Sequence, residues 1–183
     1  LVRQRGKVKE AGGNQNRQLE RLYKEAKRCV SCKDWGEALF HLEQIAMIQP
    51  GYRDTADLVT QAWHEVRLIE SYDRGTECLR SGDLDGALAH LSSVVTQSPG
   101  YRDAQAKLRE AKQRARVADL YRSGLNHYTR GQWNEAIRAF GSVIAFEPGY
   151  RHALDMLEDS RQRLELEDMY RKGLALMESA EWD

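Results

Sequence analysis

Two cysteines, Cys29 and Cys32, are the residues best suited to metal or redox chemistry, because only two residues separate them. A structural zinc ion needs four ligands, which usually come from two such pairs. The remaining candidate donors, Cys78 and five histidines, do not have the spacing of a second pair. Cys29 and Cys78 lie at equivalent positions of a sequence repeat, so we interpret them as packed core residues. We predict no metal site and no redox cofactor.

Groups for acid–base or nucleophilic catalysis are not indicated either. No Ser, His and Asp residues form a pattern typical of a catalytic triad, and there is no glycine-rich phosphate loop. Neighbouring acids such as Glu158 and Asp159 are typical of an exposed helix surface. The sequence therefore predicts no catalytic residue, no cofactor and no enzyme activity.

Three arginines form the most regular charged set in the chain. Arg53, Arg102 and Arg151 each follow the tripeptide Pro-Gly-Tyr, and they are 49 residues apart. Just after Pro-Gly, each would lie near the start of a helix, where the helix dipole disfavours a positive charge. We expect each arginine to form a salt bridge with an acid of a neighbouring helix. A row of cations that bind a ligand is the alternative.

The 49-residue interval extends over almost the whole chain. The only three prolines follow it, and so do four tyrosines: Pro50, Pro99 and Pro148; Tyr23, Tyr72, Tyr121 and Tyr170. Repeats of this length usually stack into one quasi-linear array. We predict a repeat array over residues 17–183, with units at about 17–50, 51–99 and 100–148 and a truncated unit at 149–183.

The segment before the array, residues 1–16, is basic and contains glycine and asparagine without helical periodicity. We interpret it as a basic flexible linker. Contact with an anionic membrane or a nucleic acid is the alternative, because such clusters can bind anionic surfaces.

Inside each unit the apolar residues follow a helical period, and no useful stretch alternates with period two. In the third unit one stripe runs from Tyr101 to Tyr128, between Pro99-Gly100 and a left-handed cap at Gly131. A second, shorter stripe ends before Pro148, which cannot continue a helix. The sequence thus predicts an all-α fold in which continuous helices of about 28 residues alternate with helices of about 13.

The residues of these units resemble the tetratricopeptide repeat family over residues 17–183. The third unit carries the family's small and aromatic positions in order: Gly124, Tyr128, Gly131, Trp133, Ala136, Phe140 and Pro148. The family's unit has about 34 residues, so the 49-residue interval is a departure that we interpret as an extension of each first helix. The resemblance implies an α-solenoid of helical hairpins. The version with the Pro-Gly-Tyr-Arg phrase is similar to repeats of large bacterial multidomain proteins.

In that family the first helices line a concave groove that binds partners. The positions that would face it here are Tyr23, Tyr72, Leu79, Tyr121, Leu125, Tyr128, Tyr170, Leu174 and Met177. The asparagines with which some members hold a C-terminal carboxylate are missing, so the resemblance implies an aromatic and aliphatic groove. In the alternative, the extra helical turns fill the groove and the tyrosines belong to the core.

These observations predict a non-catalytic protein–protein interaction module, a scaffold or sensor arm that binds another protein or a peptide segment. The alternative is a rigid spacer or a self-association module that uses its truncated C-terminal repeat. Nucleic acid is not an expected partner, because residues 18–183 are acidic on balance. No apolar run is long enough for a membrane span. An odd number of cysteines suits a reducing cytoplasm, which we predict as the location.

Overall fold

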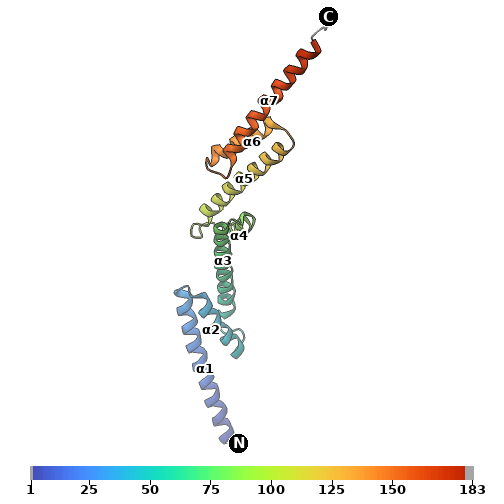
Figure 1. Ribbon diagram of the computed structural model, residues 1–183. Coiled ribbons are helices and arrows are strands. Elements are labelled where there is room, and N and C mark those ends of the chain that lie inside the picture. Colours follow the sequence, from blue (N-terminus) through green and yellow to red (C-terminus); the bar gives the residue numbers. More distant parts are fainter. Residues whose placement is uncertain (1, 180–183) are drawn as a thin grey trace. The chain divides into compact units, whose positions relative to one another are not determined.

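The computed structural model describes the backbone of residues 2–179 and the side chains of residues 13–179 (Figure 1). All regular secondary structure in this range is α-helical, which confirms the predicted all-α class. The helices are α1 (Val2–Ser31), α2 (Trp35–Ile48), α3 (Thr55–Ser81), α4 (Leu84–Gln97), α5 (Ala104–Thr129), α6 (Trp133–Phe146) and α7 (Ala153–Ser179). Within residues 2–179, no helix combines the length and the apolar character that crossing a membrane requires.

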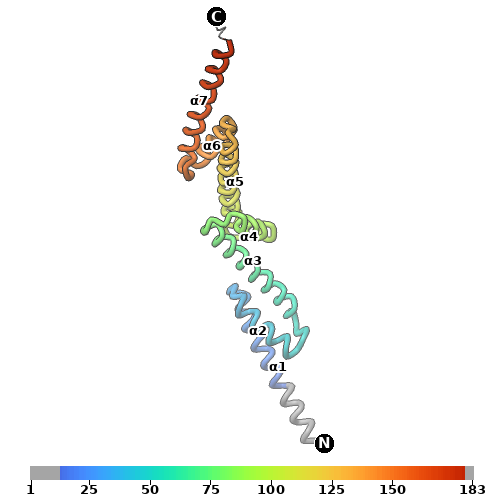
Figure 2. Tube along the Cα trace, turned by 45° about the vertical axis from the view of Figure 1, so that its right-hand side comes forward, coloured from blue at the N-terminus to red at the C-terminus, as the bar shows by residue number. Residues whose placement is uncertain are grey.

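The chain divides into two compact units. The first contains residues 1–77 and 89–104, and the second contains residues 78–88 and 105–183. In the first unit α1 and α2 lie side by side, and in the second unit α6 lies against α7 (Figures 1 and 2). Each unit has its own apolar core.

The first unit contains several small core clusters. Leu19 of α1 packs with Ile45 of α2, and Ala26 of α1 packs with Leu42 of α2 and Leu58 of α3. Near the start of α2, Trp35 packs with residues of α3 and is only 8% exposed. Apolar side chains at helical spacing on α1 and α2 therefore pair as neighbouring rows.

The second unit has one larger cluster that joins α5, α6 and the first half of α7. Its largest fully enclosed side chains are Val117, Phe140 and Val143, and Leu157 of α7 belongs to the same cluster. The helix α5 contributes to this cluster without a break, and α3 and α7 are also single helices. The predicted continuity of the long helices is confirmed.

The turns that end the long helices use the predicted left-handed cap. Gly131 and Gly82 have φ angles of 70° and 84°, and Lys33 takes the same conformation with φ 60°. After α5 the amide of Gln132 donates to the carbonyl of His127 at 3.0 Å, which closes the last turn. The cap expected at Gly131 is therefore confirmed, and a lysine replaces glycine in the first copy.

Two boundaries differ from expectation. Helix α1 begins at Val2, so residues 2–16, expected as a flexible linker, are helical. The segment has no proline, and the packed second half of α1 supplies the helix nucleus, so each added residue gains a hydrogen bond. At the other boundary, α5 begins at Ala104 instead of near Tyr101, because Arg102 has a left-handed φ of 43°.

Candidate protein-interaction site

The turns that precede α3, α5 and α7 share one architecture, which we call the joint: residues 50–53, 99–102 and 148–151. The tyrosine of each joint packs between the preceding long helix and the preceding short helix. Tyr52 contacts the cluster of Leu19 and Ile45, Tyr101 that of Leu68 and Val94, and Tyr150 that of Val117 and Val143. Each of these tyrosines therefore joins its turn to the two helices that precede it.

The arginine of each joint has a left-handed backbone. The φ angles are 49° at Arg53, 43° at Arg102 and 47° at Arg151. This conformation costs an ordinary residue about 1 kcal/mol or more, which is why glycine usually occupies it. The arginines therefore lie before the helices, outside their first turns, and the dipole argument does not apply to them. Retaining a costly conformation three times suggests that the side chain has a use.

That use is a contact with two aromatic rings. Each guanidinium carbon lies over the tyrosine of the long helix before it and over the tyrosine of its own joint, in that order in the distances that follow. The distances to the two ring centroids are 4.7 and 5.1 Å for Arg53, 4.9 and 5.2 Å for Arg102, and 5.3 and 5.2 Å for Arg151. Cation–π attraction is worth about 0.5–1 kcal/mol at exposed sites. The sequence signal for this contact was the shared period of Tyr and Arg.

The salt bridges expected for these arginines are present in two of the three joints. Arg53 pairs with Glu20, and Arg102 lies 3.8 Å from Asp73. Among residues 13–179, no acid pairs with Arg151. The positions that match the two acids hold Ala118 and Arg122 in this copy. The feature common to all three joints is the pair of rings.

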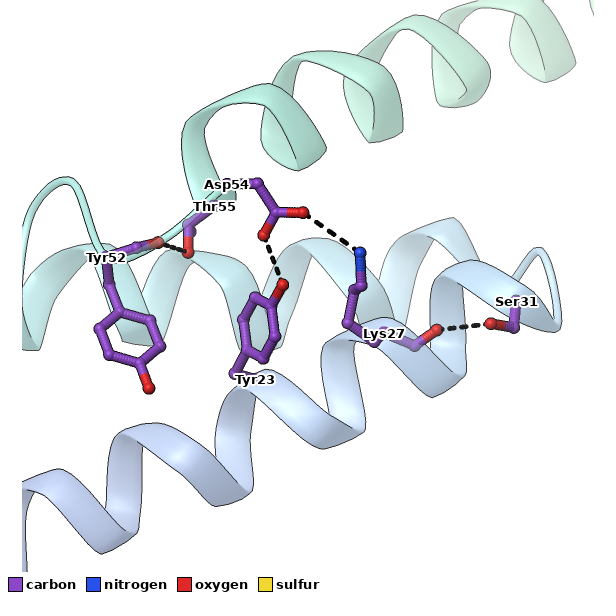
Figure 3. Close-up of polar contacts among 6 residues, drawn as sticks. All are labelled: Tyr23, Lys27, Ser31, Tyr52, Asp54 and Thr55. Atoms are coloured by element: carbon purple, nitrogen blue, oxygen red, sulfur yellow. Dashed lines mark hydrogen bonds and ion pairs between the residues drawn. The ribbon is translucent and has the colours of Figure 1, made fainter.

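Next to the first joint, a carboxylate links α1 to the start of α3 (Figure 3). The hydroxyl of Tyr23 donates to Asp54 at 2.5 Å, and Lys27 lies 3.2 Å from the same carboxylate. The hydrogen bond from Tyr23 is the main reason that the pKa of Asp54 is lowered, and it raises the pKa of Tyr23. Tyr72 donates to Asp103 in the same way in the second copy.

The tyrosines expected to line a groove lie instead against the joints in the first three copies. Tyr23 and Tyr52 meet edge to face at 5.8 Å, and Tyr121 and Tyr150 do so at 5.5 Å. The other expected groove residues of these copies are also packed. Tyr121 and Leu79 are buried, and Leu125 and Tyr128 lie partly buried against the core cluster of the second unit. These side chains are therefore buried or half-buried in the first three copies.

The fourth copy is different. We call the C-terminal half of α7 with its exposed apolar side chains the open face: Leu166, Met169, Tyr170, Leu174 and Met177. Leu166 is 61% exposed, whereas the residues at the same repeat position, Leu19, Leu68 and Val117, are 1–2% exposed. Tyr170 is 67% exposed and its counterpart Tyr121 only 8%. Of the expected groove residues, the structure thus brings Tyr170, Leu174 and Met177 together on one accessible surface.

The remaining sequence candidates are placed as follows. Cys29 is buried, and burial raises the pKa of its thiol, while Cys32 is exposed. In the described part of the chain, no three His, Cys, Asp or Glu side chains gather as a metal site would require. Trp133 packs edge to face on Tyr128 at 5.4 Å. Trp182, at the matching position of the fourth copy, lies outside the described residues.

Comparisons with known proteins identify no family for this chain. No protein-family model matches it, and no curated protein was found to be similar. The class that the structure defines is a protein built of α-helices that pack on their neighbours in the sequence.

Proposed function

We propose that the chain is a non-catalytic protein–protein interaction module, a scaffold or sensor arm that binds a partner through the open face of α7. The single observation that carries this proposal is the exposure of Leu166, Tyr170 and Met177 on one side of one helix. Monomeric soluble proteins rarely expose large contiguous apolar patches, and such patches often mark interaction sites. Large aromatic and Met side chains are also enriched at protein interfaces.

We propose further that the chain is a tetratricopeptide-like α-solenoid of a bacterial, cytoplasmic protein. This part rests on the residue pattern of the repeat, on the recurrence of the joint and on the few cysteines. The packed tyrosines of the first three copies favour a second role for that part of the chain: a rigid support without a ligand of its own, which would hold the open face in place.

Site-specific photo-crosslinking tests the main proposal. A photoreactive amino acid replaces Leu174 on the open face in one variant. In the matched control it replaces Ala175, which is also exposed and lies on the far side of α7 because each residue turns a helix by about 100°. After irradiation in the cells that make the protein, we expect discrete protein adducts at position 174 and none at position 175. Equal labelling at both positions, or none at 174, would contradict the proposal.

A further inference from the structure

We propose that the third joint binds a side-chain carboxylate of an acidic protein segment through the hydroxyl of Tyr121 and the guanidinium group of Arg151. The first two joints hold such carboxylates within the chain. In the third, among residues 13–179, no acid pairs with Arg151 or accepts a hydrogen bond from Tyr121. The joint precedes α7, whereas the open face is in the C-terminal half of that helix, so this site is additional to the one proposed above.

The residue that follows the joint differs in the third copy. In the first two copies a tyrosine of the long helix donates to the aspartate at this position: Tyr23 to Asp54 at 2.5 Å (Figure 3), and Tyr72 to Asp103. The matching residue of the third copy is His152. Its side chain is 82% exposed and lies 3.2 Å from Asp155 of α7. His152 therefore does not take the place of the aspartate beside Tyr121.

The hydroxyl of Tyr121 is a hydrogen-bond donor without an acceptor in the described chain. Tyr121 is only 8% exposed, yet among residues 13–179 no group accepts a hydrogen bond from it. In the same range, the enclosed side-chain oxygens and nitrogens without a partner belong to His41 and Thr76, so the oxygen of Tyr121 is open to solvent. A packed ring with an accessible hydroxyl is a donor whose direction is already fixed before a ligand binds.

The acids that pair with the other two joint arginines also have no equivalent here. They change in the third copy as follows: Glu20 to Ala118, and Asp73 to Arg122. Arg122 pairs with Asp119 of its own helix at 2.9 Å, but both side chains are largely exposed, and such surface pairs are weak. The third joint thus has a second cation where the second joint has a carboxylate.

The donors of the third joint suit a carboxylate. Arg151 lies over the rings of Tyr121 and Tyr150, at 5.3 and 5.2 Å from their centroids, so stacking holds its guanidinium group while the N–H groups at its edge can donate. A carboxylate matches the fork of these N–H groups and can also accept from a hydroxyl. The first joint is surrounded by two such groups, Glu20 and Asp54. A segment with several acidic side chains therefore supplies from outside what the first joint has from within the chain.

The test measures the binding of a short fluorescent peptide of glutamates, with an amidated C-terminus, to the whole chain by fluorescence anisotropy. His152→Asp restores the aspartate of the first two joints, and Gln113→Glu adds the same charge at an exposed position elsewhere on α5. We expect His152→Asp to bind the peptide about tenfold more weakly than wild type, because the introduced carboxylate accepts the hydrogen bond of Tyr121. The control Gln113→Glu should bind within about twofold of wild type, because exposed charges interact weakly.

Thermal unfolding checks that the introduced carboxylate reaches the site. We expect His152→Asp to raise the unfolding midpoint. The gain should be smaller when Tyr121→Phe is present in both chains that are compared, because phenylalanine has no hydroxyl to donate. An equal gain with tyrosine and with phenylalanine would mean that the hydroxyl of Tyr121 does not face this position, and would overturn the inference.

Other outcomes of the binding test would also overturn it. Absence of binding to wild type, or equal weakening by His152→Asp and Gln113→Glu, would show that the joint is not a carboxylate site. Equally tight binding of a glutamine peptide with a free C-terminus would assign the site to a chain terminus. Displacement of the glutamate peptide by inorganic phosphate, and not by acetate at the same ionic strength, would assign it to a phosphate group.

Discussion

The C-terminal halves of α5 and α7 carry nearly the same apolar surface, which is buried on α5 and exposed on α7. Their C-terminal halves carry matching apolar residues, yet Val117 is 1% exposed and Leu166 is 61% exposed. The difference comes from α6, which packs on that half of α5, while no described residue covers the corresponding half of α7. An apolar stripe on a helix therefore indicates which surface can be buried. Whether that surface is buried depends on the neighbouring element.

The largest expected loss of stability comes from removing the ring of Phe140, which packs on α5. Phe140→Ala removes a fully buried aromatic side chain, which costs about 3–5 kcal/mol in the free energy of unfolding. The matched change on the open face, Leu166→Ala, should stay within about 0.5 kcal/mol of wild type, because it removes few contacts. Urea unfolding followed by circular dichroism measures both. A cost above 1.5 kcal/mol for Leu166→Ala would show that the open face is covered in solution.

The next effect is a pair of identical substitutions with opposite signs. Gly124→Ala places a Cβ atom 2.7 Å from the ring of Phe140, and such overpacking costs about 1–3 kcal/mol. Gly173→Ala meets no atom and should stabilise α7 by about 0.5–1 kcal/mol, because alanine is the better helix former.

Thermal unfolding of the two variants beside wild type measures this pair. We expect a lower midpoint for Gly124→Ala and an equal or higher one for Gly173→Ala. If both substitutions lower the midpoint by the same amount, the contrast between the covered and the open helix is wrong.

The sequence was sufficient for the features that depend on local chemistry. The helical period of the apolar residues and the cap at Gly131 follow from residue type and spacing, and the structure has both. The helix over residues 2–16 was not expected, because its support comes from the packed residues that follow it.

Two parts of the candidate site also required the structure. The exposure of Tyr170 could not be read from a sequence in which Tyr121 has the same neighbours and is buried. The left-handed conformation of Arg151 could not be read either, since that conformation is rare for arginine, and the two ring contacts that accompany it come from the folded arrangement. In both cases the deciding interaction joins residues from different helices.

The smallest expected effect concerns Arg151, which lies over the ring of Tyr121 on α5, whereas among residues 13–179 no cation lies over Tyr170. Arg151→Ala loses the contact with both rings but keeps the left-handed backbone, so we expect a loss of about 0.5–1 kcal/mol. Arg151→Gly loses the same contact and removes the backbone strain, so its stability should be within about 0.5 kcal/mol of wild type. Urea unfolding of the two variants separates the side chain from the backbone. Equal stability of the alanine and glycine variants would mean that the left-handed φ of 47° carries no cost. The ring contact would then have no backbone strain to offset.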